Sequence, residues 1–383
     1  MSRADAPVAF WRCEKCGTPN PQAGYLTHCV ACGTPRSAAA RVAPARGDVR
    51  PSRPRLGRLT IAASWSYVAV LVGLIVLIAV AGERWWPTTF VLFAPRWPVL
   101  LPLGVLLPLA VLSRRRATLW PLLVATALAV GPWMGFCVPL HLPGRSASPP
   151  LLTLRVMTCN VERGRAVGLA ALIESTAPDV VLMQETPGPG VWTSRLLAGP
   201  GWHVSYQGGL AIASRLPIVE SETRSLAKPA WAGGWIRRFE LATSVGPIHV
   251  YCVHLETPRE GLEAVIRGGR GGIPALRDNM EQRSREADTA SRWVAQSSAP
   301  FLVAGDFNMP TDSPIYRRYW SSWINAFAES GFGLGHSKFT RWFGIRIDHI
   351  LAGPGWRSRR CRVGPAVGSD HRPVIADLEW APL

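Results

Sequence analysis

Hydrophobic and polar positions divide the chain into three regions with different patterns. Residues 1–58 are mostly polar, whereas residues 59–141 contain long apolar runs without charge. From residue 150 to residue 383, short apolar runs alternate with longer amphipathic ones, as strands and helices do in an α/β domain. The pattern therefore predicts a small N-terminal unit over 1–36, a linker over 37–58, a helical region over 59–141 and an α/β domain over 150–383.

The pattern of the middle region is typical of membrane-spanning helices. Residues 59–82 and 117–140 are each uncharged over 24 residues, more than the roughly 20 that a helix needs to cross the hydrocarbon core. Residues 97–113 add a shorter uncharged run with three prolines. We expect three helices, over 59–82, 90–113 and 117–140, in contact with a lipid bilayer. The alternative is a set of buried core helices in a soluble domain.

The placement of arginine predicts the orientation of these helices. The linker before the first run is rich in arginine, and Arg114, Arg115 and Arg116 lie between the second and third runs. Cytoplasmic loops carry an excess of Arg and Lys. We therefore expect an integral membrane protein of a bacterial cell membrane, with a cytoplasmic N-terminus and an external α/β domain. If the middle run does not cross, the α/β domain lies in the cytoplasm.

Four of the eight cysteines form two Cys-x2-Cys pairs near the N-terminus: Cys13 with Cys16, and Cys29 with Cys32. Four thiolates at this spacing suit a tetrahedral Zn²⁺, and so short a segment needs the metal in order to fold. The alternative is four free cysteines in a disordered tail. Together with Trp11 and Asn20, the run resembles the RanBP2-type zinc finger, although its central loop is longer. That resemblance implies a protein or single-stranded RNA ligand, and a structural or protein-docking knuckle is the more conservative interpretation.

Charge is unevenly distributed and limits the classes of partner. The chain has 42 Lys and Arg against 25 Asp and Glu, a net charge of +17. Residues 146–383 hold 26 basic and 21 acidic residues, so the largest region carries only +5. A dedicated nucleic-acid enzyme usually concentrates its basic excess in the binding domain. The mild excess here argues against that class without excluding it.

Acidic, amide and imidazole side chains follow the apolar runs of the third region, where a site built on a rigid sheet would gather. Six short motifs occur in this order: Thr158-Cys159-Asn160, Gln184-Glu185, Val253-His254-Leu255, Gly305-Asp306-Phe307-Asn308, Ile347-Asp348-His349-Ile350 and Ser369-Asp370-His371. Together they resemble the endonuclease/exonuclease/phosphatase superfamily. The resemblance covers nearly the whole third region and implies a DNase I-like four-layer α/β sandwich, which the transmembrane segment and the zinc knuckle precede.

The resemblance also implies roles for the motif residues. Asn160, Glu185 and Asp370 are expected to hold Mg²⁺ or Mn²⁺, since hard cations prefer oxygen ligands and neutralise charge on a phosphate ester. Asp306 would position or deprotonate the attacking water, and Asn308 would hold a phosphate oxygen. His371 would stand beside the scissile phosphate with Asp348 fixing its tautomer. His254 would stabilise the transition state or assist the leaving group, or would simply be a packed strand residue.

These expectations predict a membrane-anchored, Mg²⁺-dependent phosphoesterase. Its substrate could be a nucleic acid, a phospholipid headgroup or a soluble phosphate ester. The alternative is a non-catalytic membrane scaffold in which the zinc knuckle and a degenerate domain bind partners. His349 is expected to be structural, because it alternates to the strand face opposite Asp348.

Overall fold

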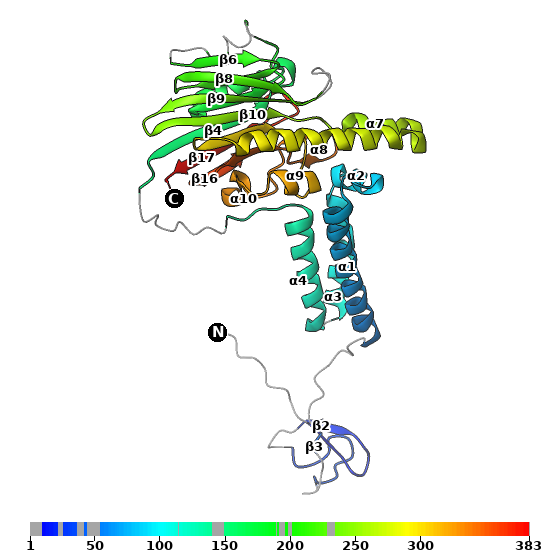
Figure 1. The fold of residues 1–383 in the computed structure, drawn as a ribbon. Coiled ribbons are helices and arrows are strands. Elements are labelled where there is room, and N and C mark those ends of the chain that lie inside the picture. Colours follow the sequence, from blue (N-terminus) through cyan, green and yellow to red (C-terminus); the bar gives the residue numbers. More distant parts are fainter. Residues whose placement is uncertain are drawn as a thin grey trace.

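The structure is a computed structural model that describes residues 10–21, 26–36, 42–43, 54–113, 115–139, 149–188, 190, 196–197, 201–227 and 234–382. Figure 1 shows a large domain built on strands, a group of helices beneath it and a small N-terminal unit. Most of the expected linker over 37–58 lies outside the described residues, as does 1–9 of the expected zinc finger.

The large domain contains two six-stranded sheets. One sheet contains β8 Ile218–Ser225, β9 Trp235–Thr243, β10 Gly246–His254, β11 Phe301–Asp306, β12 Ile324–Asn325 and β15 Asp348–Ala352. The other contains β4 Leu152–Asn160, β5 Val180–Gln184, β6 His203–Gln207, β7 Leu210–Ser214, β16 Trp356–Val363 and β17 Val374–Trp380. Their spatial orders are β12-β15-β11-β10-β9-β8 and β16-β17-β4-β5-β7-β6. A short β13 Lys338–Phe339 pairs with β14 Gly344–Ile345.

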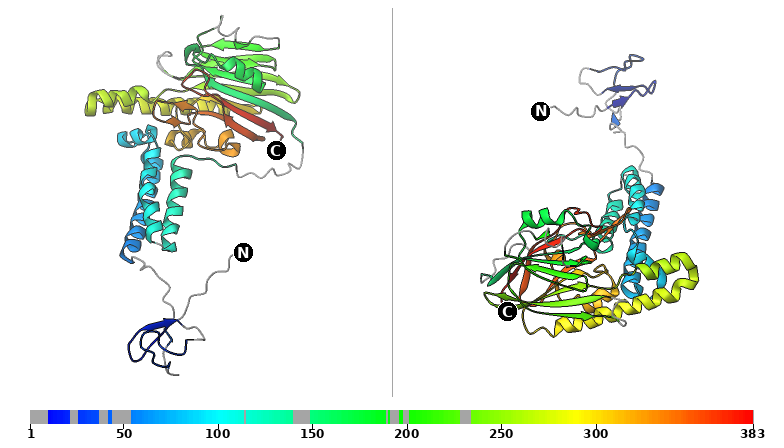
Figure 2. Two further views of the ribbon diagram at one scale, coloured as in Figure 1. Left: turned by 180° about the vertical axis from the view of Figure 1, so that it is seen from behind. Right: turned by 90° about the horizontal axis from the view of Figure 1, so that it is seen from above.

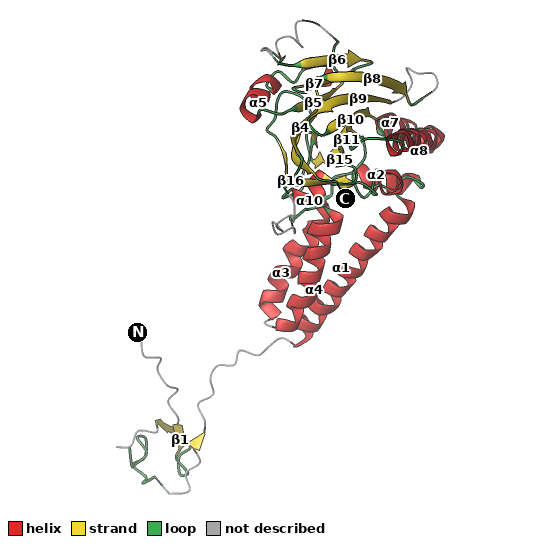
Figure 3. Ribbon diagram, turned by 60° about the vertical axis from the view of Figure 1, so that its left-hand side comes forward, coloured by secondary structure: helices red, strands yellow, loops and turns green. Residues whose placement is uncertain are grey.

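The two sheets pack face to face, with helices on their outer faces. Apolar side chains from both sheets, such as Val156 and Val250, form a core between them. The helix α5 Leu169–Thr176 covers one outer face; α8 Ile273–Ala295 and α9 Pro314–Tyr319 cover the other, as Figure 3 shows for α5 and α8. The predicted four-layer α/β sandwich is therefore confirmed.

Parallel strand pairs bring the sequence motifs together. In one sheet β4 and β5 are parallel, and Asn160 pairs with Gln184. In the other β10 and β11 are parallel, and His254 pairs with Asp306. Because parallel strands end at the same edge of a sheet, these four positions mark one end of the sandwich.

The region after residue 53 folds into packed helices. It contains α1 Pro54–Ala81, α2 Trp86–Phe93, a 3₁₀ turn Trp97–Leu100 that leads into α3 Leu101–Ser113, and α4 Leu119–Leu128 with a π-helical turn Ala129–Trp133. Apolar residues of α1, α3 and α4 such as Leu71, Leu106 and Ala125 form a shared core, and the three helices lie side by side in Figures 1 and 2.

The bounds of the helices correct part of the sequence prediction. The prediction of one continuous helix over 90–113 is wrong: the chain bends by 81° between Phe93 and Trp97. The run expected over 117–140 is helical only as far as Trp133. By length and composition, the helix Arg55–Ala81 is long and apolar enough to cross a membrane. The bent pair of helices, Trp86–Phe93 and Trp97–Ser113, is a second candidate only if the two together form one span.

Two buried or half-buried ion pairs join the helices to the large domain. Glu83, just after α1, contacts Arg283 of α8 at 2.8 Å. Arg96, between α2 and α3, contacts Asp312 before α9 at 2.8 Å. Both pairs link residues more than 190 positions apart in the sequence, so the helical region and the sandwich are in direct contact. The arm formed by α7 Arg259–Gly268 and α8 extends beyond the sheets at the level of α2 (Figure 1).

Candidate active site

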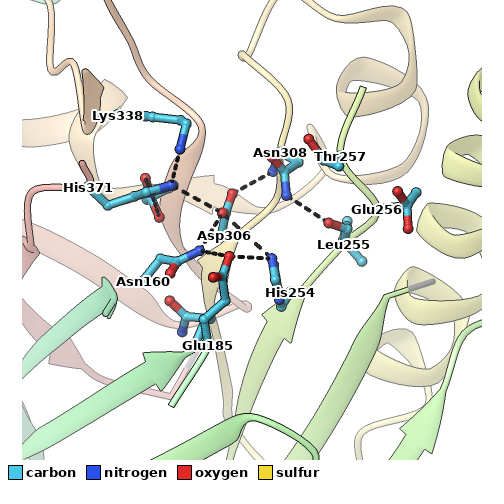
Figure 4. Close-up of polar contacts among 12 residues, drawn as sticks. Asn160, Glu185, His254, Leu255, Glu256, Thr257, Asp306, Asn308, Lys338 and His371 are labelled. Carbon is cyan, nitrogen blue, oxygen red and sulfur yellow. Dashed lines mark hydrogen bonds and ion pairs between the residues drawn. The ribbon is translucent and has the colours of Figure 1, made fainter. Parts of the chain in front are cut away.

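A cleft opens where the strands of both sheets end. Its volume is about 160 Å³ and its walls include Glu185, His254, Asp306, Asn308 and His371, as well as Lys338. Figure 4 shows these side chains converging from several different strands and loops. The structure thus brings together, in one place, residues that are spread over almost 190 positions of the sequence.

The backbone is strained at two of these residues. Glu185 follows β5 with φ 54° and Asn308 follows β11 with φ 52°. Non-glycine residues rarely adopt positive φ, and such strain is found preferentially at functional sites. Between them, Gly305 has φ 151°, and a Cβ atom there would lie 2.0 Å from the carbonyl oxygen of Val253. Only glycine therefore lets β11 approach β10 closely enough to deliver Asp306.

Two carboxylates and one carboxamide form the centre of the cleft. Asn160 donates through Nδ2 to Glu185 Oε1 at 2.9 Å and to Asp306 Oδ2 at 3.1 Å. Its Oδ1 accepts a hydrogen bond from the backbone N–H of Glu162 at 3.0 Å. The carboxamide nitrogen, rather than the oxygen expected to bind a metal ion, therefore faces the carboxylates in this structure.

Two histidines face the same carboxylates from opposite sides. His254 Nε2 lies 3.7 Å from Glu185 Oε1 and 3.9 Å from Asp306 Oδ2. His371 Nε2 lies 3.6 Å from Asp306 Oδ2. His371 Nδ1 donates to Asp348 Oδ2 at 2.8 Å. This last bond fixes the ring orientation and leaves Nε2 pointing into the cleft, as the sequence resemblance implied.

Burial and close charges perturb the titration of these groups. Burial raises the pKa of Asp306, and the negative charge of Asp348 adds to the increase. Burial alone would lower the pKa of His371, but the charges of Asp348 and Asp306 raise it to about 9. The pKa of Asp348 is lowered, since its ion pair with His371 outweighs the effect of burial. The site therefore keeps Asp348 ionised and favours a proton on the imidazole.

Lys338 is a site residue that the sequence analysis did not predict. Its Nζ lies 2.6 Å from Asp370 Oδ2 and 2.9 Å from His371 Nε2. The Lys338–His371 contact requires a free lone pair on Nε2, so Lys338 and a proton compete for that atom. Asp370, expected as a metal ligand, forms its ion pair with Lys338. The only signal in the sequence was its rarity, because the chain has three lysines among 42 basic residues.

Glu256 also lines the cleft and was missed. Burial and the neighbouring carboxylates of Glu286 and Glu260 raise the pKa of Glu256 to about 7. Its backbone is held firmly: its N–H donates to Glu286 and its carbonyl accepts from Arg283 at 3.0 Å. No motif points to it, since it follows the His254 motif in a loop.

Hydrogen bonds of its side chain and its backbone hold Asn308 in place. Its Nδ2 donates to the carbonyl of Leu255 at 2.8 Å, and its backbone N–H donates to Asp306 Oδ1 at 2.9 Å. Its backbone carbonyl accepts from Arg283 Nη2 at 2.7 Å. By contrast, His349 lies on the opposite strand face, buried against Met309, as the alternation predicted.

The donor set of the cleft is suited to a divalent cation. Among the described residues, neither Glu185 nor Asp306 has a lysine or arginine within ion-pair distance, and histidines are their only cationic neighbours. Two such carboxylates bonded to one carboxamide nitrogen leave a negative charge that a hard cation can neutralise. Glu185, a third of whose side chain is exposed, is open to the cleft.

The N-terminal cysteines form a second candidate metal site. The strands β1 Phe10–Arg12, β2 Pro19–Pro21 and β3 Val42–Ala43 pair beside it. The sulfur atoms of Cys13 and Cys32 are 3.6 Å apart, as are those of Cys16 and Cys29. Tetrahedral Zn–S bonds of ~2.3 Å place sulfurs at about 3.8 Å. All four sulfurs lie within 4.8 Å of one another.

The surroundings of Cys29 also favour a thiolate. Burial alone would raise the pKa of Cys29, but hydrogen bonds from the backbone of Ala31 and Cys32 and from Asn20 lower it to about 6. Asn20 is fully buried; its Oδ1 accepts from Val30 N–H at 2.8 Å and its Nδ2 donates to Cys29 Sγ at 3.6 Å. Asn20 therefore links the segment after the first cysteine pair to the second pair, which explains why an asparagine is found at this position of the motif.

Comparison with known proteins identifies relatives of the large domain. A model of the Endonuclease/Exonuclease/phosphatase family matches residues 157–371, more than half of the chain. Similar solved structures include a family protein of Beutenbergia cavernae (19% identity, TM-score 0.45, covering 60% of this chain and 72% of that one). The human Nocturnin catalytic domain with bound sulfate is another (16% identity, TM-score 0.45, covering 61% of this chain and 96% of that one). A third is D. rerio TDP2 with a single-stranded DNA product (15% identity, TM-score 0.44, covering 59% of this chain and 99% of that one). A search of curated proteins finds no match.

Proposed function

Because this chain belongs to the Endonuclease/Exonuclease/phosphatase family, whose members are phosphoesterases and nucleases, we propose that it is a membrane-anchored hydrolase of phosphate esters that depends on a divalent metal ion. The observation that carries this proposal is the meeting of Glu185, Asp306, His254 and His371 in one cleft, where the two carboxylates lack a lysine or arginine partner among the described residues.

Glu185 and Asn160 are the residues we propose to hold the cation, Mg²⁺ or Mn²⁺. Their side chains are hydrogen-bonded to each other at 2.9 Å, so they lie close together, and the Asn160 carboxamide would turn its oxygen toward the ion on binding. When bound, the ion would neutralise negative charge on a phosphate ester. Asp370 remains a predicted ligand, although here it pairs with Lys338 at 2.6 Å. The backbone of Glu185, with φ 54°, also helps to position its carboxylate at the cleft.

Asp306 and the His371–Asp348 pair are proposed to carry the proton chemistry. The pKa of Asp306 is raised by burial and by Asp348, which makes it a stronger base for the proton of an attacking water. His371 Nε2 lies 3.6 Å from Asp306, so an imidazolium there keeps Asp306 oriented and stabilises charge on a phosphate oxygen. Asp348 donates no proton. Its carboxylate accepts the hydrogen bond from Nδ1–H and stabilises the positive charge of the ring.

The remaining cleft residues are proposed to bind the phosphate and the leaving group. Asn308 uses one amide hydrogen to hold Leu255 O, and its other amide hydrogen is available to a phosphate oxygen. The His254 side chain is less than a third exposed and lies beside Glu185. Lys338 would transfer its contact from His371 to a phosphate oxygen, which frees Nε2 to take up a proton.

We also propose that α1 anchors the chain in a membrane. Its 28 residues span roughly 42 Å at ~1.5 Å each, and many of its apolar side chains, including Val70, Val76 and Val80, are exposed. The arginines of the linker and of 114–116 favour a cytoplasmic N-terminus and a domain on the other side. The mild charge of the domain favours lipid headgroups or soluble phosphate esters over nucleic acid as substrate.

The experiment is an assay of the full chain in detergent with Mg²⁺ against DNA, RNA, sphingomyelin and inositol phosphates. We expect hydrolysis of at least one class. Asp306→Asn, Asn308→Ala and His371→Ala should each lose on the order of 10² or more in rate, while the exposed control Arg357→Gln keeps full activity. Near-full activity in His371→Ala would overturn the assigned site.

A further inference from the structure

A second and larger pocket lies at the junction of α1, α2, α8 and α9, away from the cleft. Its volume is about 370 Å³. It begins at the turn after α1, where Glu83 and Arg84 follow the last apolar residues of the helix, and it is bounded on the other side by α8 and α9. We call it the junction pocket. In Figure 1, α8 passes across the end of α1, at the place where these elements meet.

Basic side chains surround the junction pocket. Arg84, Arg277 and Arg318 line it and are exposed. Among the described residues, none of the three has a carboxylate within 4 Å. The acidic residues of the lining are already occupied: Glu83 binds Arg283, and Glu281 lies 3.5 Å from Arg285. The pocket therefore presents three guanidinium groups that have no carboxylate partner among the described residues, although that of Arg318 lies over the ring of Tyr319.

The deeper wall of the junction pocket is apolar. Trp86, Ile273 and Leu276 contribute to it. Trp85 and Trp86 are 51% and 40% exposed, and tryptophan collects where a protein crosses the boundary between hydrocarbon and headgroups. The exposed apolar surface of α1 continues to Val80, only a few residues before the pocket. An occupant with a charged end and an apolar end would thus contact both parts.

We propose that the junction pocket binds an anionic phospholipid of the bilayer. The headgroup phosphate lies among Arg84, Arg277 and Arg318, where Arg forms strong bonds with phosphate oxygens. The acyl chains run past Trp86 along the apolar surface of α1. This site rests on the proposed membrane anchoring, because the pocket is at the level of the headgroups only if α1 crosses the hydrocarbon. Charge and position together select an anionic lipid over a zwitterionic one.

The test is a lipid titration of the delipidated full chain in detergent, read by native mass spectrometry. The probes are phosphatidylglycerol and phosphatidylcholine with the same acyl chains. We expect phosphatidylglycerol to bind the parent protein at least about tenfold more tightly. Since each basic residue near a membrane contributes roughly a factor of five, the variant R84Q/R277Q/R318Q should lose on the order of a hundredfold in affinity. The matched control R317Q/R357Q/R360Q removes the same charge from exposed positions outside the pocket and should bind normally.

Each outcome decides the proposal. Equal binding of both lipids, unchanged binding by the pocket variant, or an equal loss in the control overturns it. Displacement of phosphatidylglycerol by an equal concentration of inorganic phosphate would show a soluble-phosphate site instead and would also overturn it. Alkaline carbonate extraction of cell membranes tests the anchoring separately. Release of the chain into the soluble fraction contradicts the anchoring, whereas the lipid titration still reports whether the pocket selects anionic lipid.

Discussion

The ion pair between Glu83 and Arg283 connects the helical region to the active site, and Glu83→Gln should damage both stability and turnover. The side chains are 3% and 0% exposed. Arg283 holds the carbonyl groups of Asn308 and Glu256 at 2.7 and 3.0 Å. Glu83 also accepts hydrogen bonds from Ser313 Oγ and from the backbone N–H of Ile315. A neutral amide of the same shape would leave the guanidinium buried without a counter-charge, and arginine cannot lose its proton.

The expected size of the effect follows from this burial. Removing one partner of a buried pair costs about 3–5 kcal/mol, which for a domain of this size lowers Tm by roughly 6–20 °C. A displaced Asn308 loop should also reduce kcat on the order of 10- to 100-fold. The assay is thermal unfolding by tryptophan fluorescence in detergent, together with turnover at a temperature where the variant is folded.

A surface pair supplies the control for this prediction. Glu263 and Arg267 form an exposed i,i+4 pair on α7, and such pairs are worth about 0.3–0.5 kcal/mol. Glu263→Gln should therefore change Tm by less than about 2 °C. If Glu83→Gln behaves like Glu263→Gln, the helical region does not support the active site, and a fragment that starts at residue 150 should be as active as the full chain.

Three further predictions concern single residues. Lys338→Met should lose on the order of 10² in rate while Lys338→Arg retains more, and equal turnover of both variants would refute a charge role. Cys16→Ser should reduce the zinc content of the purified chain, measured by mass spectrometry, without changing phosphoesterase activity; a loss of activity would contradict the independence of the two sites. Burial lowers the pKa of His349 to about 4, so as pH falls from about 6.5 to about 4 the unfolded chain binds a proton that the folded chain does not. The parent should then lose about 3 kcal/mol more stability than His349→Gln, and parallel pH profiles of denaturant unfolding would refute this.

The sequence predicted the catalytic elements better than the supporting ones, for a physical reason. β5 and β11 are almost continuous apolar runs because they are buried, and β4 and β10 are buried over most of their length; turn-forming or polar residues follow these strands. β16, with the sequence WRSRRCRV, is an edge strand whose arginines face solvent. Such a strand lacks the apolar pattern that predicts a strand from sequence.

The helical region shows what an uncharged run cannot reveal. The segment expected as one helix over 90–113 contains Pro95 and Pro98, and proline removes a helical hydrogen bond and restricts the residue before it. The helix accordingly stops at Phe93 and resumes at Trp97. Likewise, Gly131 and Pro132 lie in the π-helical turn that ends the last helix at Trp133.

Long-range pairs were the least predictable part of the site. Lys338 reaches His371 through an isolated bridge between the two residues, 33 positions apart. Arg283 finds Glu83 across 200 positions. Of these four residues only His371 belongs to a motif, so only the three-dimensional arrangement shows which residues meet. Asn160, His254 and Asp306 were predictable because each is the last residue of its strand. Asp348 begins β15, and Asp370 and His371 precede β17, so these were predicted from the resemblance of their motifs.

The most direct test of the proposed function measures the Mg²⁺ dependence of hydrolysis of bis(p-nitrophenyl) phosphate by the full chain and by Glu185→Gln. Glu185 lines the cleft, a third of its side chain is exposed, and its carboxylate forms no ion pair with lysine or arginine among the described residues, so its substitution should leave folding intact. The account predicts saturable activation of the parent by Mg²⁺, complete loss with a chelator, and a rate on the order of 10² lower in Glu185→Gln. Hydrolysis that persists in chelator, or a Mg²⁺ response in Glu185→Gln equal to that of the parent, would contradict it.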